Sequence, residues 1–256
     1  MEVSGSKKMN YQFDKENISQ HIVKFGVHIQ PTISPKDDKT KLQDYCNWLI
    51  GQFPEVFETL IVGPNQLQVQ KVFVLASTKR LEMPTLVLTG RGPVLTLPQR
   101  VFIDQIHDLD IPEKDKIFRR ALDELRVRFS DRKVLRVGVV HEFVFDTGQI
   151  NSLEIIASNL KNDLWREAIK SLRILLEMPR EGKNINLEIR PTYVSRAATS
   201  SENVPIQDIR FGIIVNVDIN NQQIKGDLTK AEINDILAFA NDYVPEEMIK
   251  FLNNEY

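Results

Sequence analysis

Three stretches of the sequence share one pattern: a basic residue, an apolar residue, a glycine and then an apolar run. They are KFGVHIQ from Lys24, RVGVVHEF from Arg136 and RFGIIVNV from Arg210. Around each glycine, apolar residues occupy every second position, which is the period of a half-buried β-strand. Each glycine falls on the less apolar face, where the missing side chain leaves room for a neighbouring element. The chain is therefore expected to fold around three strands that each turn one face to the core.

Shorter patterns predict the remaining elements. Alternating or apolar runs predict further strands at residues 67–76, 85–90, 93–97 and 185–189, and the small polar run 195–205 is expected to be a mobile loop. Apolar stripes with helical spacing predict helices over residues 42–53, 118–129, 164–176 and 233–244.

Local residues refine the ends of these helices. Residues 56–61 are expected to add a further turn or two after Pro54. Ser158 is expected to cap the third helix, which ends at Pro179. Thr229 and Glu232 form the capping-box pattern that opens the last helix.

The order strand, helix, strands, helix occurs twice along the chain, and the divide lies near Ser130. We expect a flexible N-terminal segment (1–19), a first α+β half (20–130) and a second α+β half (131–256). Duplication of one unit explains the repeated order, and a chance likeness between short apolar strands is the alternative. Such units form an antiparallel sheet, or two sheets, with the long helices packed on one face. The order resembles the helix-grip and TATA-binding-protein-like folds, although a fold alone implies no function.

Composition limits the class of protein. The 256 residues carry a net charge of −2 and are 42% hydrophobic, which is typical of a soluble globular chain and makes a nucleic-acid partner unlikely. Cys46 is the only cysteine, so an intrachain disulfide is excluded. Neither a membrane-spanning apolar run nor a signal peptide is recognisable, and we expect a cytoplasmic protein without a membrane partner.

Four longer stretches carry a resemblance to a known family. They are HIVKFGVHIQP, GQFPEVFETLI, FGIIVNVDINN and the closing NDYVPEEMIKFL. Together they resemble a bacterial family of uncharacterised proteins of about this length, whose final strand ends in an apolar-Asp-apolar pattern ahead of a terminal helix. The resemblance implies two related α+β halves, and it implies no activity, cofactor or site residue.

His141 is the candidate catalytic residue. The strand period places it on the apolar face between Val139 and Phe143, where a buried histidine could act as a general base. Glu142 faces the other way and cannot orient it. The alternative is a histidine at the edge of the core that bonds to a backbone carbonyl, and this alternative is favoured. His28 lies on the opposite face and is expected to be exposed.

Two groups of polar residues are candidate binding sites. Asn216 and Asp218 line one face of the last strand, and Glu188 and Arg190 are expected on a neighbouring strand, where they could hold a ligand or a hard cation. The alternative is the solvated face of an antiparallel sheet.

The second group is the basic segment that contains Arg119, Arg126, Arg128 and Arg132, which could contact a phosphate backbone. Interleaved acidic residues favour a solvated helix face instead. The Gly-x-Gly in LTGRGPV lacks the lysine and helix of a phosphate loop and predicts a hairpin turn.

These patterns favour a non-enzymatic ligand-binding or protein-interaction module. The alternatives are a nucleic-acid-associated protein that uses a curved sheet or the basic segment, and an enzyme with His141 in a pocket. No His/Cys spacing typical of a metal site is present, and no cofactor is expected. The partner is unknown, and open edge strands make a homodimer possible.

Overall fold

A computed structural model describes residues 11–34, 36–63, 67–74, 80–89, 92–99, 114–159, 172–199, 205–221 and 226–255. The strands within these ranges are β1 (Ile18–Gln30), β2 (Thr59–Val62), β3 (Leu67–Val74), β4 (Arg80–Thr89), β5 (Gly92–Gln99), β6 (Lys133–Gly148), β7 (Ile174–Arg180), β8 (Lys183–Thr199) and β9 (Pro205–Asn221). The α-helices are α1 (Lys39–Gln52), α2 (Lys114–Arg128), α3 (Ser152–Asn159) and α4 (Lys230–Leu252).

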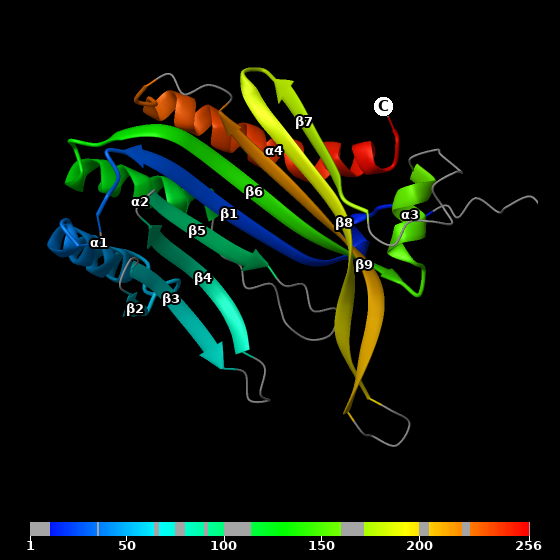
Figure 1. The fold of residues 1–256 in the computed structure, drawn as a ribbon. Coiled ribbons are helices and arrows are strands. Elements are labelled where there is room, and N and C mark those ends of the chain that lie inside the picture. Colours follow the sequence, from blue (N-terminus) through cyan, green and yellow to red (C-terminus); the bar gives the residue numbers. More distant parts are fainter. Residues whose placement is uncertain are drawn as a thin grey trace, which may run out of the picture.

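All the described strands join one antiparallel sheet in the order β2-β3-β4-β5-β1-β6-β9-β8-β7. Figure 1 shows the long helices α1, α2 and α4 on one side of this sheet. The predicted α+β class and the antiparallel sheet are therefore confirmed. We call the side with the helices the helix side and the opposite side the helix-free side.

The middle of the sheet is the long pairing between β1 and β6. Its register places Gly26 opposite Gly138, Phe25 opposite Val139 and Val23 opposite His141. In β1 the alternate residues Val23, Phe25, Val27 and Ile29 are buried, as the period of two predicts. These side chains point to the helix side and form the centre of the core.

The helices cover this core with the predicted apolar stripes. In α1 the buried residues are Leu42, Tyr45, Cys46 and Leu49. The Tyr45 hydroxyl donates a 2.8 Å hydrogen bond to the Ala121 carbonyl of α2, which satisfies a polar group inside the core. Phe118 of α2 lies against Phe25 of β1, with ring centroids 5.1 Å apart. Each such large apolar side chain contributes about 1.5–3 kcal/mol when fully buried.

Helix α4 begins as the sequence predicts. The Thr229 side chain accepts from the Glu232 backbone amide, and the Glu232 carboxylate accepts from the Thr229 amide, which completes a capping box. The last apolar stripe, from Ile233 to Val244, is buried against β6 and β9. The helix continues to Leu252, and Asn253 forms its C-cap.

Two predicted helical stretches are wrong. Residues 59–62 form strand β2 instead of a further helical turn, because they pair with β3. Residues 174–180 form strand β7 instead of the end of a helix, because they pair with β8 through a tight turn at Glu181 and Gly182. Helix α3 starts at Ser152 and ends at Asn159, so Ser158 lies near its end and is not its cap. Residues 160–171 lie outside the described residues.

Pro179 sits in β7 without a lost hydrogen bond. The two-residue turn makes Arg180 and Lys183 a hydrogen-bonded pair, so the backbone groups of every second residue before Arg180 face β8. Pro179 lies between these positions and faces the open edge, where an edge strand tolerates proline. Residues 174–180 therefore form a strand through pairing with β8, although the sequence pattern there predicts a helix.

The predicted loop at 195–205 is wrong for residues 195–199 and 205, which lie in strands, while residues 200–204 lie outside the described residues. Strand β8 continues to Thr199 and β9 begins at Pro205, and the two stay paired to these ends. The last pair between β6 and β9 joins Gly148 to Phe211, so β8 and β9 extend together beyond the rest of the sheet (Figure 1). Ile209 is 60% exposed there, although its position in the strand period predicts a core side chain.

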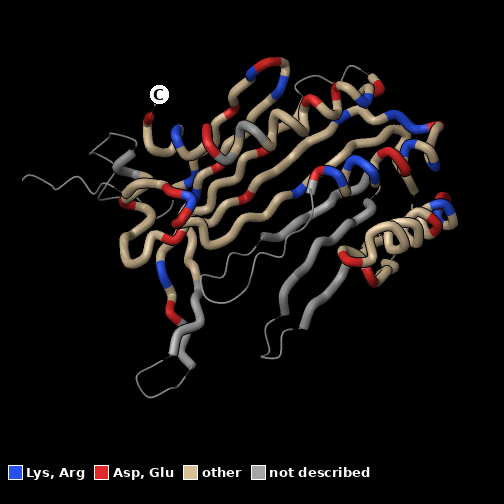
Figure 2. The backbone as a smooth tube through the Cα atoms, turned by 180° about the vertical axis from the view of Figure 1, so that it is seen from behind, with Lys and Arg blue, Asp and Glu red and all other residues tan. Residues whose placement is uncertain are grey.

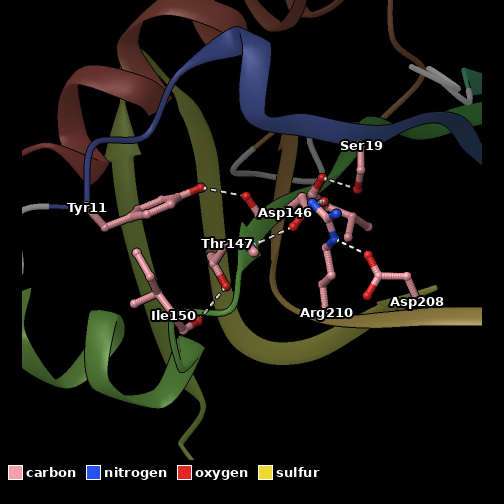
Figure 3. Close-up of polar contacts among 9 residues, drawn as sticks. Tyr11, Ser19, Asp146, Thr147, Ile150, Asp208 and Arg210 are labelled. Atoms are coloured by element: carbon pink, nitrogen blue, oxygen red, sulfur yellow. Dashed lines mark hydrogen bonds and ion pairs between the residues drawn. The ribbon is translucent and has the colours of Figure 1, made fainter. Parts of the chain in front are cut away.

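The residues from Tyr11 onward pack against the body of the protein. Phe13 is 2% exposed, and its backbone exchanges hydrogen bonds with the Asn253 side chain after α4. The Tyr11 hydroxyl donates a 3.1 Å hydrogen bond to the Asp146 carbonyl (Figure 3). Burial raises the pKa of Tyr11 to about 12. Residues 1–10 of the segment that we expected to be flexible lie outside the described residues.

Gly212 occupies a crowded position in β9. A Cβ atom there would lie 2.7 Å from Val194 Cγ2 and 2.9 Å from the Phe145 carbonyl oxygen. A Cβ atom at Gly26, the equivalent residue of the first sequence stretch, would meet no atom of the described residues within 4 Å. Close packing therefore requires glycine at position 212 but does not require it at position 26.

We expect Gly212→Ala to destabilise the protein by about 1–3 kcal/mol, because the new methyl group must displace backbone or a β-branched side chain. Gly26→Ala is the control, and its free energy of unfolding should stay within about 1 kcal/mol of the wild-type value. Urea denaturation followed by circular dichroism measures both. Equal losses in the two variants would contradict this account of Gly212.

We expect the Cys46 thiol to be unreactive in the folded protein. Cys46 is fully buried in α1, and burial raises the pKa of its thiol to about 12. At neutral pH it is therefore protonated, and only the thiolate attacks a disulfide reagent. Labelling with dithionitrobenzoate should be slow in buffer and complete in urea. Rapid stoichiometric labelling of the native protein would show that α1 opens readily.

Candidate functional site

The structure places the predicted site residues in three separate regions. His141 is on the helix side of β6, Asn216, Asp218, Glu188 and Arg190 are on the helix-free side of β9 and β8, and the arginines of the basic segment are on or just after α2. These regions cannot act together on one small molecule. Each is therefore described by itself.

His141 is 4% exposed and forms a pair with His21 of β1. The distance from His21 Nε2 to His141 Nδ1 is 3.1 Å, the ring centroids are 5.3 Å apart and the ring planes differ by 20°. The two histidine rings are nearly parallel, and their nitrogens are much closer than their centroids, so the rings meet edge to edge. One nitrogen must then donate and the other accept, so the two tautomers are linked.

The histidine pair lies in aromatic surroundings. The Phe143 ring stacks on His21 with centroids 4.2 Å apart, and Phe145 follows Phe143 along the same face of β6. Glu142 points to the helix-free side, as the strand period predicts, and lies 3.6 Å from Lys24. This setting favours the prediction of a core histidine. The sequence could not reveal this pair, because the register between β1 and β6 is not encoded in either strand by itself.

The residues predicted for the polar face are brought together. Asn216 lies opposite Glu142 on one side and Glu188 on the other, and Asp218 lies opposite Asn186. Arg190 is two residues from Glu188 on the same face of β8, and its Nε lies 3.4 Å from Glu188 Oε1. The face therefore spans four strands, from Lys24 of β1 to Arg190 of β8.

Short polar contacts connect this face. Glu188 Oε1 accepts a 2.8 Å hydrogen bond from Arg173 Nε, and this bond, supported by Asn216 and Arg190, lowers the pKa of Glu188. The Asp218 carboxylate accepts from Asn220 at 3.2 Å and from Asn186 at 3.4 Å. We call the set Lys24, Glu142, Asn186, Glu188, Arg190, Asn216 and Asp218 the polar network. Arg173 and Asn186 carried no sequence signal beyond their polarity.

One atom of the polar network is not satisfied. Asn216 Oδ1 is buried and has no hydrogen-bond partner within the described ranges. A buried acceptor without a partner costs about 1–3 kcal/mol. Asn216 Oδ1 is thus the one buried side-chain atom of the polar network that lacks a hydrogen-bond partner within the described residues.

A hard cation gains no support at this face. Within the part of the chain that the structure describes, no three or more His, Cys, Asp or Glu side chains converge as metal ligands would. The Glu188 and Asp218 carboxylates already accept from arginine and asparagine side chains. Amide and guanidinium donors therefore occupy the oxygens that a cation would need.

The basic segment is neutralised by neighbouring carboxylates. The shortest N–O distances are 3.1 Å for Arg119 with Asp115 and 2.7 Å for Arg128 with Glu124, and both are i,i+4 pairs on α2. Arg126 contacts Asp227 at 3.2 Å. These contacts agree with the predicted solvated helix face.

Arg132, just after α2, is paired in the same way. Its Nη2 atom lies 3.4 Å from Asp38, ahead of α1, and its Nε atom lies 3.3 Å from Asp131. Arg119 also donates to the Asn234 side chain of α4. Arg119, Arg126 and Arg132 thus connect different helices or loops, whereas Arg128 is paired within α2. Each of the four arginines has a carboxylate partner, so its charge is compensated.

Comparison with known proteins identifies no relative. No protein-family model, curated protein or solved structure matches this chain. The resemblance to a family of uncharacterised bacterial proteins therefore stays a prediction. Among the described helices, none is long and apolar enough to cross a membrane.

We expect the two histidines to be coupled energetically. His21→Phe and His141→Phe should each lower the free energy of unfolding by about 1–3 kcal/mol, because each leaves one buried nitrogen of the other ring without its partner. The double variant should lose less than the sum of the two single losses. Urea denaturation of the four proteins measures the coupling. Additive losses would show that the hydrogen bond contributes nothing to stability.

Proposed function

We propose that this chain is a non-enzymatic binding module that contacts another protein through the helix-free side of its sheet. The observation that carries this proposal is the polar network, which places both signs of charge and several amides on four adjacent strands. The opposite side of the same strands is covered by helices, so the helix-free side is the broad surface left for a partner (Figure 1).

We propose further that the two halves are copies of one unit and that the fold is TATA-binding-protein-like. Three observations support this. Each half begins with a central strand, β1 or β6, that pairs with the last strand of its own half, β5 or β9. Each half ends in a long helix, α2 or α4. The register sets Gly26 opposite Gly138, so a two-fold axis relating the two aligned copies would pass between these glycines.

The mixture of charges favours a protein over a nucleic acid. A phosphate backbone selects clustered lysines and arginines. The polar network instead combines Lys24 and Arg190 with the carboxylates of Glu142, Glu188 and Asp218. In Figure 2, basic and acidic residues are intermingled along the helices and at the sheet ends of the described part of the chain.

Charge complementarity would then define the partner. Lys24 and Arg190 have side chains that are 38% and 42% exposed, and they can donate to acidic groups of another protein. Glu142, with a side chain that is 21% exposed, can accept a donor between them. Such a surface gives specificity and a fast association rate more than high affinity.

The enzyme hypothesis has the least support. A general base must come within hydrogen-bond distance of the proton that it removes. His141 is 4% exposed and already forms a hydrogen bond with His21, whose ring stacks on Phe143. A structural role for the pair accounts for these contacts without a substrate.

The proposal is tested by photo-crosslinking in the host of the protein. p-Benzoylphenylalanine replaces Arg190 on the helix-free side in one variant and Val127, which is 72% exposed on α2, in the control. We expect a discrete protein adduct from position 190 and none from position 127, because only the first lies in the proposed interface.

The adduct should weaken when Lys24→Glu is added, because a charge reversal within the network opposes the same partner. Equal adducts from both positions would contradict the proposal. An adduct to nucleic acid would favour the alternative function.

A further inference from the structure

Strands β8 and β9 extend beyond all their neighbours in the described part of the sheet. Strand β7 pairs with β8 only as far as Ile189, and β6 pairs with β9 only as far as Phe211. Beyond these points β8 and β9 are paired with each other alone, to Thr199 and Pro205. Figures 1 and 2 both show this two-stranded ribbon projecting from the body.

The outer edge of the ribbon at β9 has backbone groups available for pairing. In an antiparallel ladder the N–H and C=O groups of one residue face the same neighbour, and successive residues alternate. The tight turn after β7 sets this alternation, so Ile209 faces away from β8. Apart from β8 on its inner side, no described strand pairs with β9 at this residue. An unpaired edge of this kind is a template for a further strand.

Apolar side chains accompany this edge. Ile209 is 60% exposed and Tyr193 is 70% exposed, and both lie on the helix side of the ribbon. The Tyr193 ring contacts Phe211, with centroids 5.6 Å apart. Two strands alone seldom bury enough apolar surface to be stable in water. A third strand beside β9 would cover Ile209 and part of this apolar group.

The charged residues beside Ile209 indicate which strand would fit against this edge. Asp208 and Arg210 flank Ile209 on the helix-free side, and they contact each other at 2.6 Å (Figure 3). Their side chains are 29% and 35% exposed. If a second β9 is placed antiparallel with Ile209 opposite Ile209, then Asp208 of each copy lies opposite Arg210 of the other. Opposite charges across a strand pair are stabilising.

We infer that this chain self-associates through the β9 edge of the ribbon, with two copies paired antiparallel about Ile209. The arrangement has two-fold symmetry, which is the commonest symmetry of soluble oligomers. It joins the two ribbons into one four-stranded sheet and brings the apolar groups of both copies together. The interface is short, so association will depend on protein concentration.

The other edges of the sheet are less suited to this role. Strand β7 has Pro179 on its open edge, where it offers no N–H group to a partner. Strand β2 is only four residues long. The inference is independent of the proposed function, because the ribbon edge and the polar network are different parts of the sheet.

Charge exchange and sedimentation velocity test this interface. Asp208→Arg gives a copy with two basic residues at the edge, and Arg210→Asp gives a copy with two acidic residues. We expect the wild-type protein to self-associate and each variant to have a dissociation constant raised about tenfold or more, because like charges then face each other. Mixing the two variants should restore association as a one-to-one complex.

Two further variants separate the interface from effects on folding. Arg210 also lies 4.0 Å from the buried Asp146 carboxylate, so its replacement can affect stability. Ile209→Glu leaves that contact in place and sets two carboxylates against each other at the symmetry axis, so it should abolish self-association. Val127→Asp places a charge on an exposed apolar residue of α2 and should leave association unchanged.

Several results would overturn the inference. One is a wild-type protein that stays monomeric at every concentration reached. Another is self-association that Ile209→Glu does not weaken. A third is a mixture of folded Asp208→Arg and Arg210→Asp variants that does not form the complex. Circular dichroism of each variant establishes that it is folded before the comparison.

Discussion

The pairing of β1 with β6 is the constraint on which the rest of the structure depends. Its register decides which residues of each half reach the core and which reach the opposite side. A slip of β1 by one residue along β6 would turn Phe25 away from the helices and bring Lys24 among them. The apolar helix side and the polar network are thus two results of one register.

Much of this arrangement could be predicted from local patterns. The period of two located β1, β6 and β9 and the direction of His141 and Asn216, and the Thr229–Glu232 box located the start of α4. The failures share one cause. The apolar stripe over residues 164–176 fits a helix, yet pairing with β8 makes residues 174–180 strand β7. The His21–His141 hydrogen bond likewise depends on a contact between residues 120 positions apart.

The same reasoning explains why the ribbon was missed. Residues 195–205 are small and polar, which is typical of a loop, but backbone pairing does not require apolar side chains. Ile209 kept the strand period and still became exposed, because β6 ends at Gly148 and pairs with β9 only as far as Phe211. Alternation predicts the face of a side chain, and only the extent of the neighbouring elements determines whether that face is covered.

The two proposed surfaces have a geometric relation. Side chains opposite each other in an antiparallel pair lie on the same face of the sheet. When two copies pair through Ile209, Asp208 and Arg210 of both copies lie on the helix-free side, as do both polar networks. A pair of molecules would therefore present two binding faces toward the same side. A partner with two matching surfaces would bind such a pair with greater avidity than it binds one copy, so weak self-association and a modest contact at each polar network would support each other.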